Sequence, residues 1–441
     1  MMADYEQGDI KMTTVELPKS ENGLHGTLTV PGDKSISHRS IMLGAISHGT
    51  TVVNHFLLSD DCLHTIGAFR ELGVAIAVDG DQVTIEGKGG FDHFTKPTKP
   101  LDMGNSGTST RLLLGFLSHQ PFDIDLFGDA SLSKRPLDRV IKPLAKMGVH
   151  VTATDDNFLP VTLHTNPQLR GLDYQLPVAS AQVKSALVWA GLQAEQPSHL
   201  TEKLITRDHT EKMIAQFGGH LEQDGLEITV TPQDHFEAQQ ITVPGDISSA
   251  AFFLVAAACV PGSQITLKQV GLNQTRDGIL KALDQMNAHY TITNRSTDSE
   301  PAGDITIGYQ ALTALKLGAK DIPAVVDEVP LIALAATQAQ GTTVITGAEE
   351  LRVKETDRIA TVTEELTKMG AKITPQPDGF IIEGGTKLHT ATTPLDSHGD
   401  HRIGMMLAVA NLIAGGNSVL NNADSISVSY PEFFNDLDQL R

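Results

Sequence analysis

A short pattern recurs along this chain of 441 residues, and it limits the possible folds more than any other feature. Each copy consists of the end of a predicted helix, a closing Gly or Asn, and an alternating apolar strand that opens a hairpin. The closing residues follow one another at intervals of 75, 70, 69 and 83 residues, and they are Gly73, Gly148, Gly218, Asn287 and Gly370. Such self-similarity predicts a chain assembled from repeated structural units.

A second, more apolar helix precedes each copy of the pattern. Six such helices are expected to begin near Lys34, Asn105, Ser180, Ile247, Asp327 and Asp400. The sixth unit has no hairpin at the C-terminus, and we expect the N-terminal strands 14–17 and 26–30 to supply it. The sequence therefore predicts an α/β fold of six units, and generic α/β alternation is the alternative interpretation.

The place where the chain divides is indicated by a second repeat. The segment Val30-Pro31-Gly32-Asp33 is echoed by Val243-Pro244-Gly245-Asp246, and Pro-Gly pairs are typical of turns and chain crossings. We therefore predict crossovers near 31–33 and 243–246. Residues 33–243 would form one domain of three units, and residues 1–32 plus 244–441 would form the other. Two domains joined by two adjacent strands are expected to hinge.

Charge and composition exclude several classes of protein. The chain has 33 Lys+Arg against 53 Asp+Glu, a net charge of −20, which argues against nucleic acid or an anionic membrane as partner. The longest apolar segment, 250–260, is shorter than the roughly 20 residues of a membrane span. Residues 1–11 resemble neither a signal nor a transit peptide, and we expect a frayed tail. Cys62 and Cys259 lack the spacing of a zinc site or a disulfide framework, which favours two core residues in a cytoplasmic protein.

The starts of the six apolar helices carry unusual chemistry. If pseudosymmetry makes these helices equivalent, their N-termini would point into one cleft, where unpaired N–H groups and helix dipoles attract anions. Polar, small or cationic residues stand at the first three starts: Lys34, Ser35, Arg39, Asn105, Gly107, Ser180, Ala181 and Gln182. Further cations follow predicted strands at Lys134, Arg135, Arg207, Lys354, Arg358 and Arg402. The alternative for each residue is ordinary capping or a solvated surface charge.

Two carboxylates stand among these cations. Asp327 is expected to begin the fifth helix, and Glu355 lies between Lys354 and Arg358. Neighbouring cations lower the pKa of a carboxylate and desolvation raises it, so both residues are candidates for proton transfer, with N-caps or ion pairs as the alternative. His398 and His401 have HxxH spacing without a third ligand, which favours a solvated or capping pair over a metal site.

Together these segments resemble the 5-enolpyruvylshikimate-3-phosphate (EPSP) synthase family over essentially the whole chain. The motifs that carry the resemblance are residues 33–39 (Asp-Lys-Ser-Ile-Ser-His-Arg), 104–111 (Gly-Asn-Ser-Gly-Thr-Ser-Thr-Arg), 134–136 (Lys-Arg-Pro), 352–358 (Arg-Val-Lys-Glu-Thr-Asp-Arg) and 400–402 (Asp-His-Arg). The resemblance implies a two-domain, inside-out α/β barrel of six βαβαββ repeats, three per domain. It also implies transfer of the enolpyruvyl group of phosphoenolpyruvate to the 5-hydroxyl of shikimate 3-phosphate, with release of phosphate. The implied protein is a monomer without metal or organic cofactor.

The resemblance also implies roles for individual residues. Shikimate 3-phosphate would be held by Lys34, Ser35, Arg39, Ser180, Ala181, Gln182, Arg207, Asp327 and Lys354. Phosphoenolpyruvate would be held by Lys34, Asn105, Gly107, Arg135, Gln182, Arg358 and Arg402. Asp327 would take the hydroxyl proton, while Glu355 and Lys34 would act on the methylene carbon and the leaving phosphate.

Some positions depart from the family pattern. Ser429 stands where many members have a Lys, Glu350 replaces an Asn, and Ala181 replaces a Ser. Because Gly107 leaves room for a phosphoenolpyruvate mimic, the resemblance also implies inhibition by glyphosate.

Three competing assignments can be weighed against this family. The nearest is UDP-N-acetylglucosamine enolpyruvyl transferase, which typically presents a Cys on the loop equivalent to 128–136, where this chain has none. A non-catalytic phosphate-binding scaffold is the second, and retention of both Asp327 and Glu355 disfavours it. An RNA-end-processing relative is the third, and the small number of aromatic residues in an acidic chain disfavours RNA binding.

Overall fold

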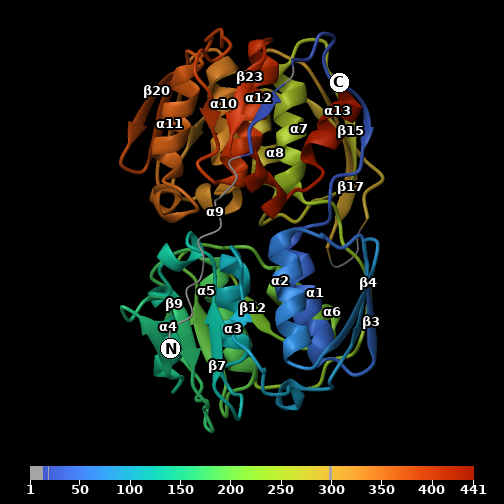
Figure 1. Ribbon diagram of the computed structural model, residues 1–441, viewed down its shortest axis with the longest axis vertical. Helices are drawn as coiled ribbons and strands as arrows, with labels where there is room; N and C mark the ends of the chain where they lie inside the picture. The colour runs from blue at the N-terminus through green and yellow to red at the C-terminus, as the bar shows by residue number, and fades with distance from the viewer. Residues whose placement is uncertain (1–12, 18, 297–299) are drawn as a thin grey trace.

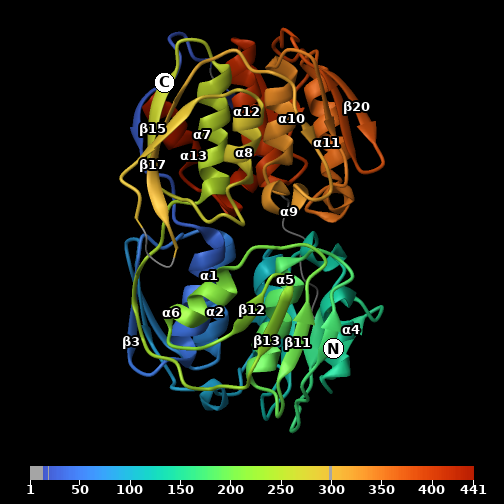
Figure 2. The same ribbon diagram turned by 180° about the vertical axis from the view of Figure 1, so that it is seen from behind.

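The structure is a computed structural model that describes residues 13–17, 19–296 and 300–441. The polypeptide forms two domains, one above the other in Figure 1 and seen from behind in Figure 2. One hydrophobic core, that of the lower domain, is drawn from residues between 36 and 243. The core of the upper domain is drawn from residues 17–30 and 247–440. The frayed tail predicted for 1–11 lies outside the described residues.

The strands of the described residues form six sheets, one for each predicted unit. The sheets of the lower domain are β14(Gln240–Thr242)-β3(Thr50–Asn54)-β5(Gln82–Glu86)-β4(Ala75–Asp79), β6(Leu101–Asp102)-β7(Ile124–Phe127)-β9(Phe158–Leu163)-β8(Val151–Thr154) and β10(Asp173–Gln175)-β11(Ser198–Thr201)-β13(Glu227–Val230)-β12(Glu222–Asp224). Those of the upper domain are β16(Tyr290–Thr293)-β17(Ala302–Gly308)-β15(Gln264–Gly271)-β2(His25–Leu28), β18(Lys316–Leu317)-β19(Thr342–Ile345)-β21(Gly379–Glu383)-β20(Lys372–Gln376) and β1(Val15–Leu17)-β23(Ser418–Asn421)-β22(Leu395–Asp396).

The six sheets share one pairing scheme. Each contains one parallel pair, such as β6 with β7 or β22 with β23, and its remaining pairs are antiparallel. A parallel pair needs a crossover helix between its strands, whereas an antiparallel pair can be closed by a tight turn. In four sheets an inner helix joins the two parallel strands in this way, as the βαβαββ arrangement requires. In the other two, the outer parallel strand, β14 or β2, comes from a distant part of the chain. The α/β class and the six-unit organisation are confirmed.

In the part of the chain that the structure describes, six apolar helices fill the interior, three in each domain. They are α1(Lys34–Ile46), α3(Gly107–Phe116), α5(Ala181–Leu192), α7(Ile247–Cys259), α10(Val329–Gln338) and α12(His401–Ala414). All of α7 is buried because its residues are apolar or small on every face. Every one of the six starts within two residues of its predicted position. In the upper domain α7, α10 and α12 pack against one another, and the sheets lie outside them (Figures 1 and 2).

A second set of helices, less buried than the inner ones, follows the strands that come after the inner helices. They are α2(Asp60–Glu71), α4(Asp138–Lys146), α6(His209–Gln216), α8(Gly278–Gln285), α11(Arg358–Lys368) and α13(Phe433–Leu440), with the short α9(Ile322–Val325) before α10. The predicted closing residues after the first five all have positive φ, including Asn287 at 61° and Gly148 at 98°. That left-handed conformation is the one that favours Gly and Asn, so this prediction is confirmed.

The predicted N-terminal hairpin is wrong. β1 pairs antiparallel with β23 and completes the sixth sheet, but β2 pairs parallel with β15 in the neighbouring sheet. The strand that precedes α1 therefore belongs to the upper domain, while β14, which precedes α7, pairs with β3 in the lower domain. The last strand before each crossing therefore pairs with a sheet of the domain that the chain is leaving. The chain enters the other domain directly after β2 and directly after β14.

Cys62 and Cys259 are free and buried, which confirms the prediction that both are core residues. Burial raises the pKa of the Cys259 thiol to about 12. Among the described residues, no helix is long and apolar enough to cross a bilayer.

Candidate active site

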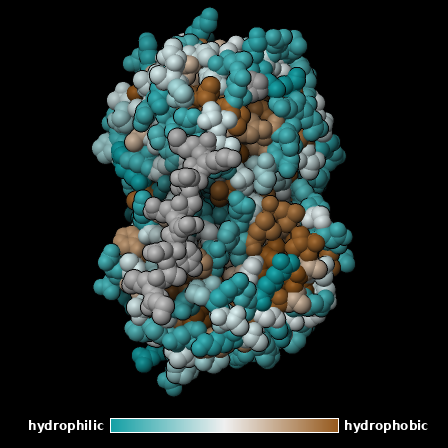
Figure 3. All heavy atoms as spheres, viewed as in Figure 1, coloured by the Kyte–Doolittle hydropathy of each residue, from teal (hydrophilic) through white to brown (hydrophobic). Residues whose placement is uncertain are grey.

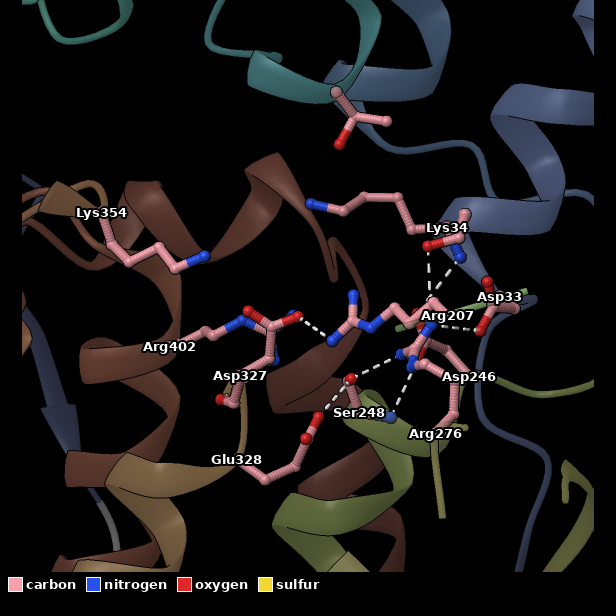
Figure 4. Close-up of polar contacts among 12 residues, drawn as sticks. Asp33, Lys34, Arg207, Asp246, Ser248, Arg276, Asp327, Glu328, Lys354 and Arg402 are labelled. Atoms are coloured by element: carbon pink, nitrogen blue, oxygen red, sulfur yellow. Dashed lines mark hydrogen bonds and ion pairs between the residues drawn. The ribbon is translucent and has the colours of Figure 1, made fainter. Parts of the chain in front are cut away.

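The two crossings lie side by side and bring two helix N-termini together. Asp33 N–H donates to the Pro244 carbonyl at 2.8 Å, and Asp246 N–H donates to the Pro31 carbonyl at 2.8 Å. The buried guanidinium of Arg276 joins both aspartates at 3.1 Å (Figure 4). Burial of Asp33 opposes its ionisation, but Arg276 and other groups leave its pKa lowered. The two copies of the Pro-Gly-Asp segment, at 31–33 and 244–246, therefore lie next to each other, and Arg276 forms an ion pair with the aspartate of each copy.

Each of these aspartates also caps a helix. Asp33 accepts the N–H of Ile36 in α1 at 3.0 Å, and Asp246 accepts the N–H of Ser248 in α7 at 2.8 Å. Asp246 accepts a second bond, from the backbone N–H of Lys34, at 3.1 Å. Because one carboxylate caps α7 and also contacts the start of α1, the first residues of both inner helices are fixed relative to each other.

Lys34 extends from the first turn of α1 into the space between the domains. Its Nζ lies 3.0 Å from Oδ2 of the buried Asp61 in α2. Burial disfavours the ammonium, yet Asp61 raises the pKa of Lys34 overall. Figure 4 shows Lys34 and Lys354 pointing from opposite sides toward the same space above Arg207 and Asp327. On the face drawn in Figure 3, hydrophilic residues near the middle of the molecule lie beside a hydrophobic patch at the right, just below the waist.

Arg39 lies one turn further along α1, is buried, and donates its hydrogen bonds to neutral groups. Its Nε donates to Thr210 Oγ1 at 2.7 Å, and its terminal nitrogens donate to Ser185 Oγ at 2.8 Å and the Ser35 carbonyl at 3.0 Å. Burial is the main cause that lowers the pKa of Arg39 to about 10. Nearby, Ser180 Oγ caps α5 by accepting the N–H of Val183 at 3.4 Å.

Asn105, Gly107, Arg135 and Gln182 lie together at the starts of α3 and α5. Arg135 donates to Asn105 Oδ1 at 2.6 Å, and Gln182 Nε2 donates to Thr108 Oγ1 at 3.0 Å. Arg135 also lies 3.3 Å from Glu355 Oε1 of the upper domain. A Cβ added at Gly107 would stand 2.7 Å from a terminal nitrogen of Arg111 and 3.5 Å from one of Arg135.

The upper domain brings carboxylates as well as cations. Arg358, at the start of α11, lies 2.8 Å from Asp400, 2.6 Å from Glu355 and 3.7 Å from Asp327. These anions raise the pKa of Arg358 although burial opposes the charge. Arg402, in the first turn of α12, lies 3.7 Å from Asp327.

The two candidate carboxylates form contacts across the domain boundary. Arg207 of the lower domain lies 2.5 Å from Asp327 of the upper domain (Figure 4). Arg135 of the lower domain lies 3.3 Å from Glu355 of the upper domain. Burial acts to raise the pKa of both carboxyl groups, but the surrounding cations outweigh it. Arg402 and Arg207 hold the pKa of Asp327 well below its usual range. Arg358 and Arg135 do the same for the pKa of Glu355. Both groups are therefore anions at neutral pH. Asp327 does not begin a helix as predicted, because it lies in the turn between α9 and α10.

The positions that depart from the family pattern lie at the edge of this cluster. Glu350 is 3.4 Å from Lys354 Nζ and 3.9 Å from a terminal nitrogen of Arg139, so it links the two domains weakly. Ala181 is the first residue of α5, and Ser429 is a largely buried residue after the 3-10 helix η4(Ala423–Val428). Most of the predicted binding residues lie on the ends of the inner helices or on the loops beside them, and Arg358 begins the outer helix α11.

Sequence reasoning misjudged one member of the HxxH pair. His398 is exposed, and its Nε2 lies 2.8 Å from Glu365. His401 is buried in the first turn of α12, and burial with the Lys34 and Arg402 charges lowers its pKa well below the usual value. Its Nε2 has no hydrogen-bond partner among the described residues. The signal that was available is its place beside Arg402 at the start of an inner helix.

Three other neighbours of the cluster were not predicted. Asp61 pairs with Lys34, Asp400 with Arg358, and Arg111 contacts Gln182. Asp61 lies in an outer helix without any motif, so nothing in the sequence links it to Lys34. Asp400 and Arg111 do lie within motifs that carry the family resemblance, where a role could have been assigned to them.

Comparison with known proteins gives a consistent result. Residues 18–437 match the profile of the EPSP synthase (3-phosphoshikimate 1-carboxyvinyltransferase) family. A 3-phosphoshikimate 1-carboxyvinyltransferase of Leuconostoc mesenteroides is 55% identical over 97% of this chain and 99% of its own, and one of Geobacillus thermodenitrificans is 52% identical over 97% and 99%. A solved structure of EPSP synthase from Acinetobacter baumannii superposes with a TM-score of 0.85 at 42% identity, covering 97% of this chain and 98% of its own.

Proposed function

The chain belongs to the EPSP synthase (3-phosphoshikimate 1-carboxyvinyltransferase) family, and from this premise we propose how its interdomain cluster performs the family reaction. The reaction transfers the enolpyruvyl group of phosphoenolpyruvate to the 5-hydroxyl of shikimate 3-phosphate and releases phosphate. The observation that carries the proposal is the pair of carboxylates, Asp327 and Glu355, held among cations that come from both domains. A cleft rich in cations suits two polyanionic substrates, and two carboxylates suit two proton transfers.

We assign shikimate 3-phosphate mainly to the lower domain. Arg39 supports this role because neutral groups accept its hydrogen bonds, so its charge is available to a phosphate. The full proposed set is Lys34, Ser35, Arg39, Ser180, Ala181, Gln182, Arg207, Asp327 and Lys354. Ala181 can contribute only its backbone and its methyl group, since it has no polar side chain.

We assign phosphoenolpyruvate to the space between Arg135 and Arg358. Both arginines approach Glu355, and forked guanidinium groups match carboxylate and phosphate oxygens. Gly107 lets the start of α3 come close to this ligand. The full proposed set is Lys34, Asn105, Gly107, Arg135, Gln182, Arg358 and Arg402.

The proposed steps conserve atoms and charge. Glu355 first takes up a proton from water once the substrates are bound. The 5-oxygen of shikimate 3-phosphate then bonds to C2 of phosphoenolpyruvate while its proton passes to Asp327, and Glu355 delivers its own proton to C3. The resulting tetrahedral intermediate loses phosphate when Glu355 takes a proton back from C3. The bond between C2 and the phosphate oxygen breaks, Lys34 stabilises the leaving phosphate, and Asp327 passes the hydroxyl proton to that phosphate, which restores both carboxyl groups to their state before the addition.

Substrate binding would prepare both carboxylates for these roles. With the cleft as described, arginines hold the pKa values of Asp327 and Glu355 low, which makes the first a weak base and keeps the second unprotonated. Substrate anions would neutralise Arg207, Arg135 and Arg358 and so raise both pKa values. We therefore propose that proton transfer becomes effective only when both substrates are bound.

We further propose that the boundaries 31–33 and 243–246 act as a hinge. The two crossing strands are hydrogen-bonded to each other, and the contacts across the cleft include ion pairs that substrate anions would compete for. Solution scattering tests this: shikimate 3-phosphate should compact the protein, and an unchanged radius of gyration would contradict it. We also propose a cytoplasmic monomer, which the two free buried cysteines support as far as the compartment is concerned.

Phosphate release tests the proposed reaction. We expect release with phosphoenolpyruvate and shikimate 3-phosphate together and none with either alone. UDP-N-acetylglucosamine as the acceptor serves as the control for the sibling enzyme. Release that does not depend on shikimate 3-phosphate, or that is faster with the nucleotide sugar, would overturn the assignment.

A further inference from the structure

Arg111 is a partly buried arginine on α3 that the proposed mechanism does not use. One terminal nitrogen donates to Gln182 Oε1 at 3.0 Å and to the Gly107 carbonyl at 3.4 Å. The other donates to the Pro136 carbonyl at 3.1 Å. Burial and the adjacent Arg135 lower the pKa of Arg111 to about 10, so it is still a cation at neutral pH.

The three acceptors belong to three separate segments, and each segment carries a residue assigned to phosphoenolpyruvate. Gly107 begins α3, Gln182 lies in the first turn of α5, and Pro136 directly follows Arg135. We propose, on the basis of the assigned function, that Arg111 is a positioning residue that fixes these three segments relative to one another.

Gln182 shows how this positioning works. Its Oε1 accepts from Arg111 while its Nε2 donates to Thr108 Oγ1 at 3.0 Å, so both ends of the amide are fixed. Without Arg111, Gln182 Oε1 loses its donor, and the orientation of the amide is held only by the bond from Nε2 to Thr108. The Arg135 loop would lose its bond at Pro136 at the same time. A planar group with several donors can hold three acceptors, whereas the single ammonium of Lys cannot match that geometry.

Arg111 also determines the effect of any side chain at Gly107. An added Cβ would lie 2.7 Å from an Arg111 terminal nitrogen, with Arg135 next at 3.5 Å, and the shorter distance is too close for two heavy atoms. A methyl group at this position must therefore shift the end of the Arg111 side chain, which would weaken its bonds to Gln182 and Pro136. We therefore expect part of the cost of Gly107→Ala to phosphoenolpyruvate binding to act through Arg111.

Steady-state kinetics of Arg111→Met and Arg111→Lys test the positioning role. For Arg111→Met we expect the KM for phosphoenolpyruvate to rise about tenfold or more, and the KM for shikimate 3-phosphate to rise less, because the hydrogen bonds of Arg39 go to other partners. Arg111→Lys keeps the charge and should recover part of the loss. The matched control is Arg70→Met, since Arg70 on the outer helix α2 donates to the Ile76 carbonyl, and we expect unchanged constants.

A double-mutant cycle tests the link to Gly107. Gly107→Ala should raise the KM for phosphoenolpyruvate in both the wild-type and the Arg111→Met background. The fold-increase in the Arg111→Met background should be at least about threefold smaller. Equal effects in both backgrounds, or an unchanged KM in Arg111→Met, would overturn the proposal. If Arg111→Met does not fold, the same cycle with Arg111→Lys decides. The wild-type protein tests the function separately, because absence of turnover there would refute the reaction and not the role of Arg111.

Discussion

The buried arginines of the two domains have opposite surroundings. Arg39 of the lower domain donates to two hydroxyl groups and a carbonyl, and burial lowers its pKa to about 10. Arg358 of the upper domain lies within 3.7 Å of three carboxylates, which raise its pKa. Both side chains are almost fully buried, so the difference comes from their partners and not from exposure to solvent.

This difference indicates a division of labour between the domains. The positive charge of Arg39 is not neutralised by a carboxylate bonded to it, and we expect a bound anion to supply that charge. The upper domain instead holds a network of alternating charges in which carboxylates can exchange protons. Arg207 and Arg135 connect the two environments, because they come from the lower domain and contact Asp327 and Glu355.

The largest expected effect comes from removing an upper-domain carboxylate. Glu355→Gln keeps the shape and an oxygen that Arg135 and Arg358 can contact, but it cannot exchange a proton. We expect kcat to fall by roughly 10²- to 10⁴-fold. The control is Glu349→Gln, an exposed residue on the 3-10 helix η3(Glu349–Val353), which should leave kcat unchanged. Normal kcat in Glu355→Gln would exclude this residue from proton transfer.

Stability should distinguish the two arginines directly. Arg358→Gln removes the cation that the buried Asp400 shares with the partly buried Asp327 and Glu355, which should destabilise the protein by about 3 kcal/mol. Arg39→Gln leaves two hydroxyls that already bond each other at 2.7 Å, and we expect a cost of about 1 kcal/mol. Urea denaturation of both variants under the same conditions measures this difference. Similar losses would show that the contrast between the domains has no energetic meaning.

The smallest effect is a pH dependence that should have opposite signs at two nearby histidines. The folded protein lowers the pKa of His401, so the unfolded chain binds a proton that the folded protein rejects, and stability falls as pH drops below about 6.5. A bond to Glu365 raises the pKa of His398, so its smaller, solvent-screened contribution is present below about pH 6.5 and is lost as pH rises through the folded-state pKa.

Denaturation midpoints between about pH 5 and 8 measure both contributions. His401→Gln should remove up to about 1.4 kcal/mol per pH unit of the loss of stability at acid pH. His398→Gln should remove a weaker dependence of the opposite sign. If both variants change the profile in the same direction, the assignment of His401 as a buried neutral group fails.

The local features of the fold were the ones that could be predicted. Asn287 and the closing glycines adopt the left-handed conformation for which their residue types are suited, and the six inner helices start where polar residues precede apolar runs. These features depend on a few consecutive residues and on period, so the sequence contains them. Asp33 and Asp246 were found as a repeat for the same reason, although their common partner Arg276 was not.

Long-range pairing was the part that sequence reasoning could not reach. β2 was expected to form a hairpin with β1, but it pairs with β15, which lies far away along the chain. The predicted site residues do lie together, yet their contacts with Asp61, Asp400 and Arg111 depend on how separate units pack. No pattern within any one unit specifies those contacts.

By itself, the sequence determined a chain of six repeated units, the residues that cap and close their helices, and a set of cations whose positions favour one anion-binding cleft over solvated surface charge. Only the tertiary structure decided which carboxylate meets which cation, that His401 is buried and His398 is exposed, and that Arg111 joins three segments. The physical reason is that charge interactions depend on distance and burial. Both are set by the packing of the two domains and not by the order of residues along the chain.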